Sequence, residues 1–198
     1  MKRSSGILLA VSSLPSPYGI GTLGQAAYDF ADFLHAADQR YWQMLPLGPT
    51  SYGDSPYQSF SAYAGNPYYI DPELLIADGL LTRSECSRCK WGGESRHVDY
   101  GRIYEKRVDL LRKAFKRGWQ RSGEAVAAFV EANSRWLPDY ALFMACKRHF
   151  GMKAWTEWPD DIRLRQEGAV EKYRALLRED VEFFTYLQYL FFQQWNRL

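Results

Sequence analysis

Aromatic, hydroxyl and amide side chains crowd together between residues 41 and 69, in the segment YWQMLPLGPTSYGDSPYQSFSAYAGNPYY. A pyranose ring has apolar C–H faces that stack on tyrosine or tryptophan, and a rim of hydroxyls that need Asn, Gln, Asp or Ser partners. Pro and Gly recur along the segment, and such a loop can direct several side chains at one ligand only when a rigid scaffold holds it. These residue types therefore indicate a carbohydrate-binding surface.

The elements that must hold this loop are predicted just before it. The apolar run over residues 6–10 predicts a buried strand, residues 23–37 a helix, and residues 41–45 a second short strand. Alternation along the second strand sends Tyr41 and Trp42 to opposite faces and puts one of them in the core. Strand, helix and strand in succession open an alternating α/β fold. The loop begins where the second strand ends, which is where parallel α/β barrels build their active sites.

Consecutive helices dominate the pattern from residue 71 onward. Such a run cannot consist of βαβ units, so it indicates a largely helical subdomain that is inserted after an early strand of the barrel. We expect residues 1–70 to form the first strands, a helix and the substrate loop, residues 71–168 the inserted subdomain, and residues 169–198 a helix that returns to the barrel. Helices are predicted over about 72–78, 100–120, 123–133, 137–150 and from 169 to the end.

The last predicted helix is apolar nearly all the way round, in FFTYLQYLFFQQWNRL. A helix of this kind is buried between other elements, and no capping Gly or Asn follows it. We therefore expect that its neighbours are missing and that the 198 residues are the N-terminal portion of a longer protein, with a barrel incomplete at Leu198. An incomplete barrel would also expose an edge through which copies of the chain could associate.

The charge balance argues against nucleic acid as a partner. With 25 Lys and Arg against 23 Asp and Glu, the formal net charge is only +2, which is small for a protein that neutralises phosphates. The densest basic run, residues 112–121, includes Phe115 and Trp119, as an RNA-binding helix would. Apolar residues recur in the same region at spacings of three and four, so they form one face of a helix and most of the basic side chains lie on the opposite, solvated face. The apolar residues are Tyr104, Val108, Leu111, Phe115 and Trp119. A basic RNA-binding protein is an alternative that would require salt-dependent RNA affinity.

Targeting and cysteine signals are weak. The apolar stretch over residues 6–11 is shorter than the roughly 7 to 15 residues of a signal-peptide core, and no run approaches the roughly 18 apolar residues of a membrane span. Three cysteines do not make a disulfide framework. We expect a cytoplasmic protein without membrane association.

Cys86 and Cys89 form a CxxC motif, which His97 and Cys146 could complete as a zinc site. One such pair without a second pair at finger-like spacing is more often a chance match. We therefore expect no metal.

Several longer strings resemble one enzyme family. GILLAVSSLPSPYGIGTLG, PLGPTSYGDSPYQSFSAYAGNPYYID, WLPDYALFMACK and FFQQW are similar to the N-terminal part of the 4-alpha-glucanotransferases, the amylomaltases of glycoside hydrolase family 77. The second string is far more specific than a three-residue motif. The resemblance covers nearly the whole chain and is weakest from Cys86 to Gly93.

This resemblance implies the N-terminal part of a (β/α)8 TIM barrel with a helical insertion, in a fold of the α/β class. It also implies transfer of α-1,4-glucan segments to glucose or maltooligosaccharide acceptors by retaining double displacement, without a metal or organic cofactor. Such a reaction needs two carboxyl groups about 5 Å apart. The family carries its catalytic carboxylates on later barrel strands, so no catalytic residue is expected here and the chain alone is expected to be inactive.

The resemblance also assigns substrate-binding residues. Tyr57 in SPYQ matches a family tyrosine that packs on the sugar next to the scissile bond. Ser55 and Gln58 would donate or accept hydrogen bonds with sugar hydroxyls, and Asp54 would hold the loop.

A second glucan-binding surface outside the active site is implied by two further tyrosines. Tyr52 in SYGD and Tyr104 in VDYGRIY match positions that form it in some members of the family, although helix periodicity alone places Tyr104 toward the core. An alternative from a different class is a glucan-binding module without catalysis, since ring-stacking residues are present and a carboxylate pair is not evident.

Overall fold

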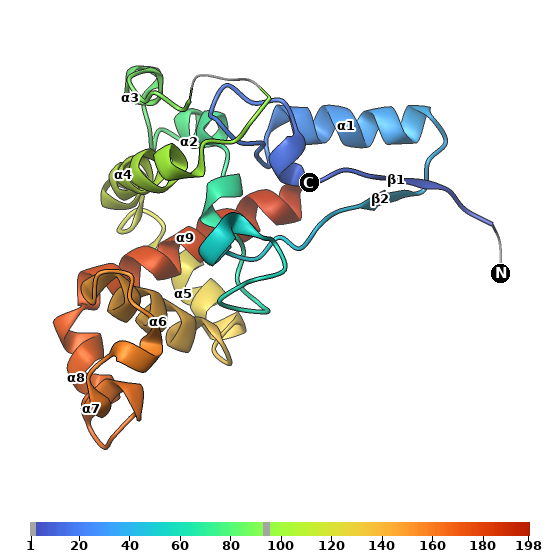
Figure 1. The fold of residues 1–198 in the computed structure, drawn as a ribbon. Coiled ribbons are helices and arrows are strands. Elements are labelled where there is room, and N and C mark those ends of the chain that lie inside the picture. Colours follow the sequence, from blue (N-terminus) through green and yellow to red (C-terminus); the bar gives the residue numbers. More distant parts are fainter. Residues whose placement is uncertain (1–2, 93–95) are drawn as a thin grey trace. The chain divides into compact units, whose positions relative to one another are not determined.

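The computed structural model describes residues 3–92 and 96–198, and the chain in it divides into two compact units (Figure 1). The first unit extends to Gly118 and also includes Leu190–Leu198, and the second unit is Trp119–Tyr189. The division into residues 1–70, 71–168 and 169–198 concerns the complete barrel and stays a prediction.

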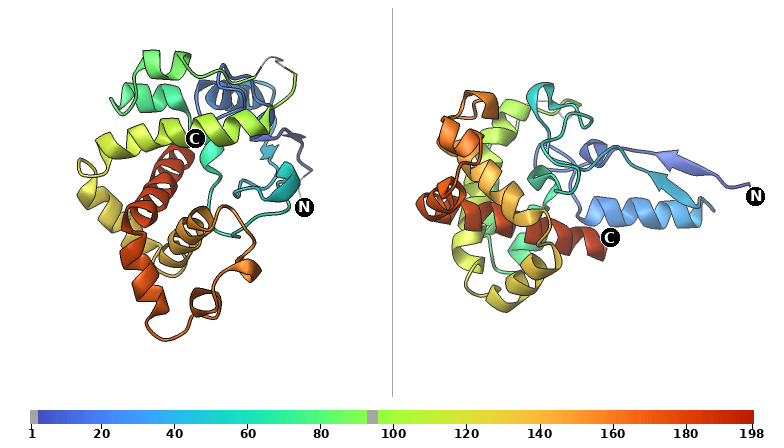
Figure 2. Two further views of the ribbon diagram at one scale, coloured as in Figure 1. Left: turned by 60° about the vertical axis from the view of Figure 1, so that its left-hand side comes forward. Right: turned by 90° about the horizontal axis from the view of Figure 1, so that it is seen from below.

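A β–α–β unit opens the first compact unit. Strands β1 (Gly6–Leu8) and β2 (Tyr41–Gln43) are parallel and pair in the register Gly6 to Tyr41, and helix α1 (Gln25–Ala36) connects them. The helix lies along the two strands in both Figure 1 and Figure 2. The predicted strand–helix–strand order is confirmed, with shorter strands than expected.

Trp42 and Tyr41 point to opposite faces of β2, as the alternation predicts. The Trp42 ring is half-buried and packs edge-on against Phe30 of α1, with 4.7 Å between ring centroids, and its Nε1–H donates to the carbonyl of Leu9 at 2.8 Å. Tyr41 is 64% exposed. Trp42 is therefore the more buried member of the pair, and it packs against α1.

Helices make up most of the remaining described chain. The first unit contains η1 (Val11–Ser13), η2 (Tyr52–Asp54), η3 (Pro67–Tyr69), α2 (Pro72–Ala77), α3 (Arg83–Ser87) and α4 (Tyr100–Gly118). The second contains α5 (Gly123–Ala132), α6 (Leu137–His149), η4 (Trp155–Glu157), α7 (Asp160–Arg163), α8 (Ala169–Leu176) and most of α9 (Arg178–Arg197).

The helix predicted from residue 169 to the end is in fact two helices. The chain leaves helical geometry at Leu177, with φ −107° and ψ 25°, so that α8 ends before α9 begins. The side chains from Phe183 to Gln188 are all buried. The expectation that so apolar a helix lacks its neighbours is wrong for this segment, because the chain itself covers it.

Helix α4 buries only part of the face that apolar spacing predicts: Leu111 and Phe115 are buried, and Val108 and Trp119 are half-buried. Tyr104 is 37% exposed, whereas Arg107 is fully buried. Its basic residues beyond Arg112 are exposed, as expected for a solvated face. The residues that it buries are Ile103, Arg107, Leu110, Leu111, Ala114, Phe115 and Gly118.

Buried Arg107 connects α4 to two separate loops. Its guanidinium donates to the carbonyl of Ile70 at 3.3 Å and to the carbonyl of Tyr18 at 3.2 Å, and it lies over the Trp91 ring, 4.9 Å from the centroid. Burial lowers the pKa of Arg107 to about 10, so it keeps its charge at neutral pH. A single side chain thereby fixes the end of the loop between β2 and α2 against the helix.

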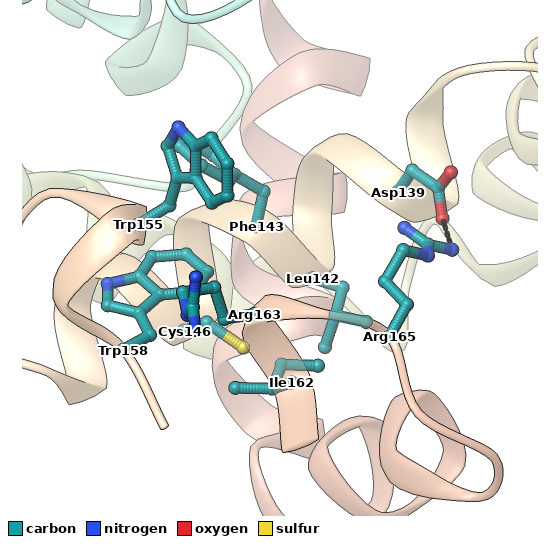
Figure 3. Close-up of a pocket in the computed structure, with 9 residues that line it drawn as sticks. All are labelled: Asp139, Leu142, Phe143, Cys146, Trp155, Trp158, Ile162, Arg163 and Arg165. Atoms are coloured by element: carbon teal, nitrogen blue, oxygen red, sulfur yellow. Dashed lines mark hydrogen bonds and ion pairs between the residues drawn. The ribbon is translucent and has the colours of Figure 1, made fainter. Parts of the chain in front are cut away.

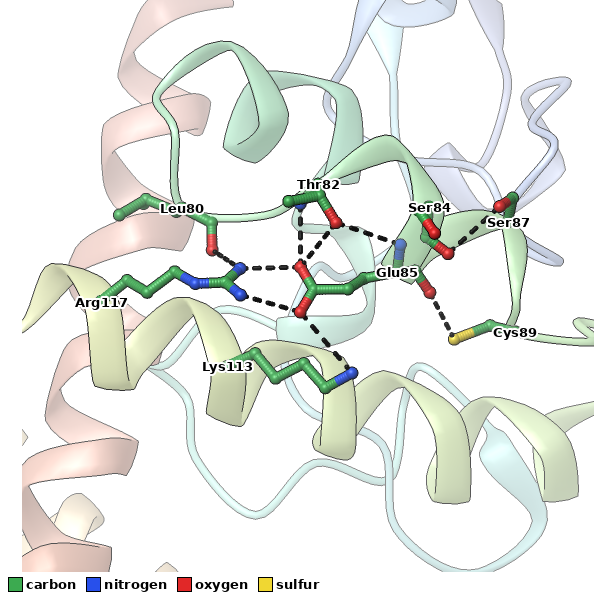
Figure 4. A network of polar contacts seen from close by, with 8 residues as sticks. All are labelled: Leu80, Thr82, Ser84, Glu85, Ser87, Cys89, Lys113 and Arg117. Atoms are coloured by element: carbon green, nitrogen blue, oxygen red, sulfur yellow. Dashed lines mark hydrogen bonds and ion pairs between the residues drawn. The ribbon is translucent and has the colours of Figure 1, made fainter.

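Helix α3, which the sequence did not predict, begins with a reciprocal cap (Figure 4). The Thr82 hydroxyl accepts from the backbone N–H of Glu85, and the Glu85 carboxylate accepts from the N–H of Thr82. The same carboxylate pairs with Arg117 of α4 at 2.7 and 2.8 Å and with Lys113 at 3.8 Å. Arg117 holds the pKa of Glu85 at about 2, well below its ordinary value.

The CxxC motif lies on α3 and just after it. Cys86 is buried, which raises its pKa to about 11, and Cys89 donates its S–H to the carbonyl of Glu85. Within residues 3–92 and 96–198, no three His, Cys, Asp or Glu side chains are grouped so that they could hold a metal ion.

Among the helices of residues 3–92 and 96–198, none is long and apolar enough to span a membrane.

Candidate functional site

The loop between β2 and α2 consists of an exposed part and a buried part. We call residues 50–63 the loop tip and residues 64–71 the loop base. In the tip, Thr50 and Ser59 form an antiparallel bridge, and the N–H of Ser51 donates to the carbonyl of Gln58 at 2.9 Å. Gly53 has φ 77°, a left-handed conformation that favours glycine. The tip is thus a closed turn with its own backbone hydrogen bonds.

Three of the predicted substrate-binding residues come together in this turn. Tyr57 is 74% exposed, and its backbone N–H donates to Ser55 Oγ at 3.3 Å. The N–H of Gln58 donates to the carbonyl of Ser55 at 3.1 Å, and the Gln58 side chain is exposed. The turn therefore presents an aromatic face with a hydroxyl and an amide beside it, the groups that a sugar ring needs.

Asp54 is the only carboxylate between residues 41 and 69. Its backbone has φ 55°, and its N–H donates to the carbonyl of Ser51 at 3.2 Å. Its Oδ1 is buried and has no hydrogen-bond partner among the described residues, and burial raises the pKa of its carboxyl group. One acid cannot provide the two carboxyl groups of a retaining mechanism.

Tyr104 belongs to a cluster of three tyrosines. Its ring centroid lies 5.3 Å from that of Tyr68 and 6.3 Å from that of Tyr100. Burial and then the charge of Asp54 raise the pKa values of Tyr68 and Tyr100, so this carboxylate is close to the cluster. The side chain of Tyr52, the other residue predicted for a second glucan-binding surface, lies outside what the structure describes.

Several exposed or clustered aromatics were not singled out from the sequence. Tyr63 is 68% exposed in the loop tip, and Tyr68 and Tyr100 join Tyr104. Tyr100 and Tyr104 are four residues apart on one helix, a spacing that places side chains together. That spacing could have revealed the cluster, whereas the exposure of Tyr63 has no signal in the sequence.

The loop base is held from several directions. Asn66 is 1% exposed, its N–H donates to the carbonyl of Leu47 at 2.8 Å, and its Oδ1 accepts from the N–H of Tyr68 at 3.0 Å. Gln194, in the part of α9 that belongs to the first unit, exchanges two hydrogen bonds with the backbone of Asp71, at 2.7 and 3.2 Å.

Gly65 completes the contact between the loop base and the end of α9. A Cβ atom at this position would lie 2.0 Å from the Phe191 ring. The base is therefore a rigid support from which the tip projects.

Comparison with known proteins places the whole chain beside one family. The family model described as 4-alpha-glucanotransferase matches residues 9–198. The 4-alpha-glucanotransferase of Streptococcus pneumoniae is 50% identical over 199 residues, and that of Thermus thermophilus is 47% identical over 203 residues. Each match covers 100% of this chain and 39% of the relative, so the chain spans about two fifths of the length of these proteins.

Solved structures agree with the sequence comparisons. The amylomaltase of Streptococcus agalactiae, determined in complex with acarbose, superposes with a TM-score of 0.95 at 43% identity, covering 99% of this chain and 40% of that one. The amylomaltase of Corynebacterium glutamicum, at 18% identity and a TM-score of 0.65, shares the fold.

Proposed function

The chain belongs to the 4-alpha-glucanotransferase family, glycoside hydrolase family 77, and we propose that it supplies one wall of the substrate cleft of such an enzyme. The reaction is the transfer of α-1,4-glucan segments to glucose or maltooligosaccharide acceptors. It proceeds by double displacement through a covalent glucosyl-enzyme intermediate. The β1–α1–β2 unit is the beginning of its (β/α)8 barrel, and the enzyme acts in the cytoplasm.

The single observation that carries this proposal is the loop tip. Tyr57, 74% exposed, offers its ring to the apolar face of a glucosyl unit, and Ser55 and Gln58 offer hydrogen bonds to its hydroxyls. Because the buried base already holds the ends of the tip in place, the tip loses less conformational entropy when it binds a sugar.

The chain's share of the reaction is binding and orientation. Stacking on Tyr57 fixes the plane of one sugar ring and covers one side of the cleft against water. Exclusion of water favours a sugar acceptor over hydrolysis. The paired carboxylates of the mechanism are assigned to later strands of the enzyme, and no residue of this chain is given a catalytic role. Tyr104 and Tyr52 are assigned to a second glucan-binding surface.

A chimeric enzyme tests this function. Residues 1–198 would replace the matched segment of the Streptococcus pneumoniae relative, and the product would be incubated with maltotriose. Release of glucose together with longer oligosaccharides is expected. A folded chimera that binds maltotriose without making products would instead indicate a glucan-binding module.

The loop is tested in the same chimera. Tyr57→Ala is expected to lower kcat/KM for transfer by about tenfold, since loss of an aromatic stacking contact is worth about 1 kcal/mol or more. It should also raise the ratio of hydrolysis to transfer. Tyr57→Phe keeps the ring and should remain close to the parent chimera. Unchanged transfer and hydrolysis in Tyr57→Ala would rule out the assigned role.

A further inference from the structure

A pocket of about 310 Å³ lies within the second compact unit (Figure 3). Its floor is apolar, with Leu142 and Cys146 of α6 and Ile162 of α7. This volume falls at the lower end of the range for small-ligand pockets, roughly 300 to 1,000 Å³.

Indole rings form one side of the pocket. Trp155 is 52% exposed, whereas Trp158 is 7% exposed and packs against Phe143 and Phe150 with ring centroids 5.4 and 5.5 Å apart. Figure 3 shows the two indoles on the same side, with Phe143 beside Trp155. The exposed Trp155 ring therefore lies beside the buried Trp158 ring, which its neighbours hold in place.

The turn that presents Trp155 is itself anchored. Buried Lys147 donates from Nζ to the carbonyls of Met152 and Lys153, both at 3.2 Å. Met152 has φ 63° and follows Gly151, also left-handed at 67°. The backbone leading to Trp155 is therefore held in place before any ligand arrives, which lowers the entropy lost on binding.

Charged groups lie on the rim in neutral pairs. Arg165 contacts Asp139 at 3.1 Å on the side opposite the indoles in Figure 3, and Arg163 contacts Asp160 at 2.7 Å. Each of the two lining arginines therefore has a carboxylate partner, and Asp139 is the partner that itself lines the pocket. The rim offers N–H donors and a carboxylate acceptor that can be shared with a neutral polar ligand.

The exposed indole and the paired charges together indicate which kind of ligand the pocket binds. An anion such as a phosphate would meet the Asp139 carboxylate and two arginines that already have carboxylate partners. A wholly apolar ligand would remove water from these ion pairs. A neutral sugar satisfies both parts, because its C–H face stacks on the exposed indole and its hydroxyls reach the rim.

We propose that this pocket binds a glucosyl unit of an α-glucan. The inference deepens the proposed function and rests on it for the identity of the sugar. Trp155 is the residue that contacts the sugar.

The test uses the 198-residue chain and isothermal titration calorimetry with maltoheptaose. Tyr57→Ala removes the loop contact, and binding that persists belongs to the pocket. Adding Trp155→Ala to that variant should weaken the remaining affinity at least about tenfold. Leu164→Ala, 57% exposed and outside the pocket lining, is the matched control and should change nothing.

Each outcome separates the two sites. If Trp155→Ala weakens binding but Tyr57→Ala does not, the pocket stands and the assignment of the loop fails. If Trp155→Ala leaves maltoheptaose binding unchanged in both backgrounds, the pocket proposal is overturned, and the loop assignment stands where Tyr57→Ala weakens that binding.

A second measurement does not depend on an alanine variant that folds. The indole N–H signal of Trp155, identified in a ¹⁵N spectrum by its absence from Trp155→Phe, should shift when maltoheptaose is added. A signal that stays in place at saturating maltoheptaose would also overturn the proposal.

Discussion

The loop tip and the loop base use the same residue type for opposite purposes. Tyr57 and Tyr63 in the tip are 74% and 68% exposed, whereas Tyr69 in the base is 5% exposed. No side chain of the described chain covers most of either tip ring, while the base lies under Arg107 and the end of α9. Tyrosine in this loop is therefore an exposed surface residue or a core residue, depending on which other segments of the folded chain cover it. We therefore expect substitutions in the base and its supports to lower stability more than substitutions in the tip.

Removal of Arg107 should have the largest effect on stability. Arg107→Ala leaves the carbonyls of Ile70 and Tyr18 without donors and opens a cavity beside Trp91. We expect it to lower the free energy of unfolding by about 3 to 5 kcal/mol. Urea unfolding followed by circular dichroism measures this loss. Lys116→Ala, at an exposed position of the same helix, should stay within about 0.5 kcal/mol of the parent chain.

A methyl group at Gly65 should have the next largest effect. Because the added Cβ would lie 2.0 Å from the Phe191 ring, Gly65→Ala should cost about 1 to 3 kcal/mol through overpacking. Thermal unfolding should show a lower Tm. In a Phe191→Leu background the same substitution should cost less, since a smaller side chain can yield. Equal costs in the two backgrounds would exclude this contact as the cause.

Glu85 should stabilise the chain in a pH-dependent way without affecting the loop. Its folded-state pKa of about 2 lies below the ordinary value of 4.5, so its contribution is complete above pH 4.5 and is lost as the pH falls toward 2. Partial exposure of Arg117 limits the effect to about 1 kcal/mol.

The neutral isostere isolates this charge. Glu85→Gln should be less stable than the parent by that amount at pH 7, and the two should converge near pH 2. Glucan affinity should be the same in both. A stability difference independent of pH would show that the capping geometry, and not the charge, is responsible.

Tyr57→Ala should have the smallest effect on stability and a clear one on binding. A ring that is 74% exposed contributes little to the core, so the free energy of unfolding should change by less than about 0.5 kcal/mol. Tyr69→Ala is the matched change in the base and should cost about 3 kcal/mol. Similar losses for both would abolish the distinction between tip and base.

The fold was predictable where the local pattern was strong. Apolar runs gave the two strands, and helical spacing gave α1, α4, α5 and α6 close to their observed bounds. Helix α3 was missed although Thr82 and Glu85 form a readable capping box, because five residues show no period. The face of α4 was predicted correctly at Leu111 and Phe115 and wrongly at Tyr104. Buried Arg107 was missed because spacing counts it as polar and its carbonyl partners come from distant loops.

The sites also differ in whether local sequence could reveal them. SPYQ placed Ser55, Tyr57 and Gln58 in one turn, because close neighbours in a tight loop stay close in space. No short motif of this kind predicted the pocket beside Trp155. Its lining spans Asp139 to Arg165 and comes from α6, η4, α7 and residues beside them.

The sequence by itself determined the family, the order of the first strands and helix, and the aromatic and polar content of the loop, since these depend on residue type and short spacing. Only the tertiary structure decided which tyrosines face solvent, that Arg107 lies in the core, and that Trp155 borders a pocket. Those properties depend on which distant segments cover a side chain, and coverage is a property of the packed chain and not of local sequence.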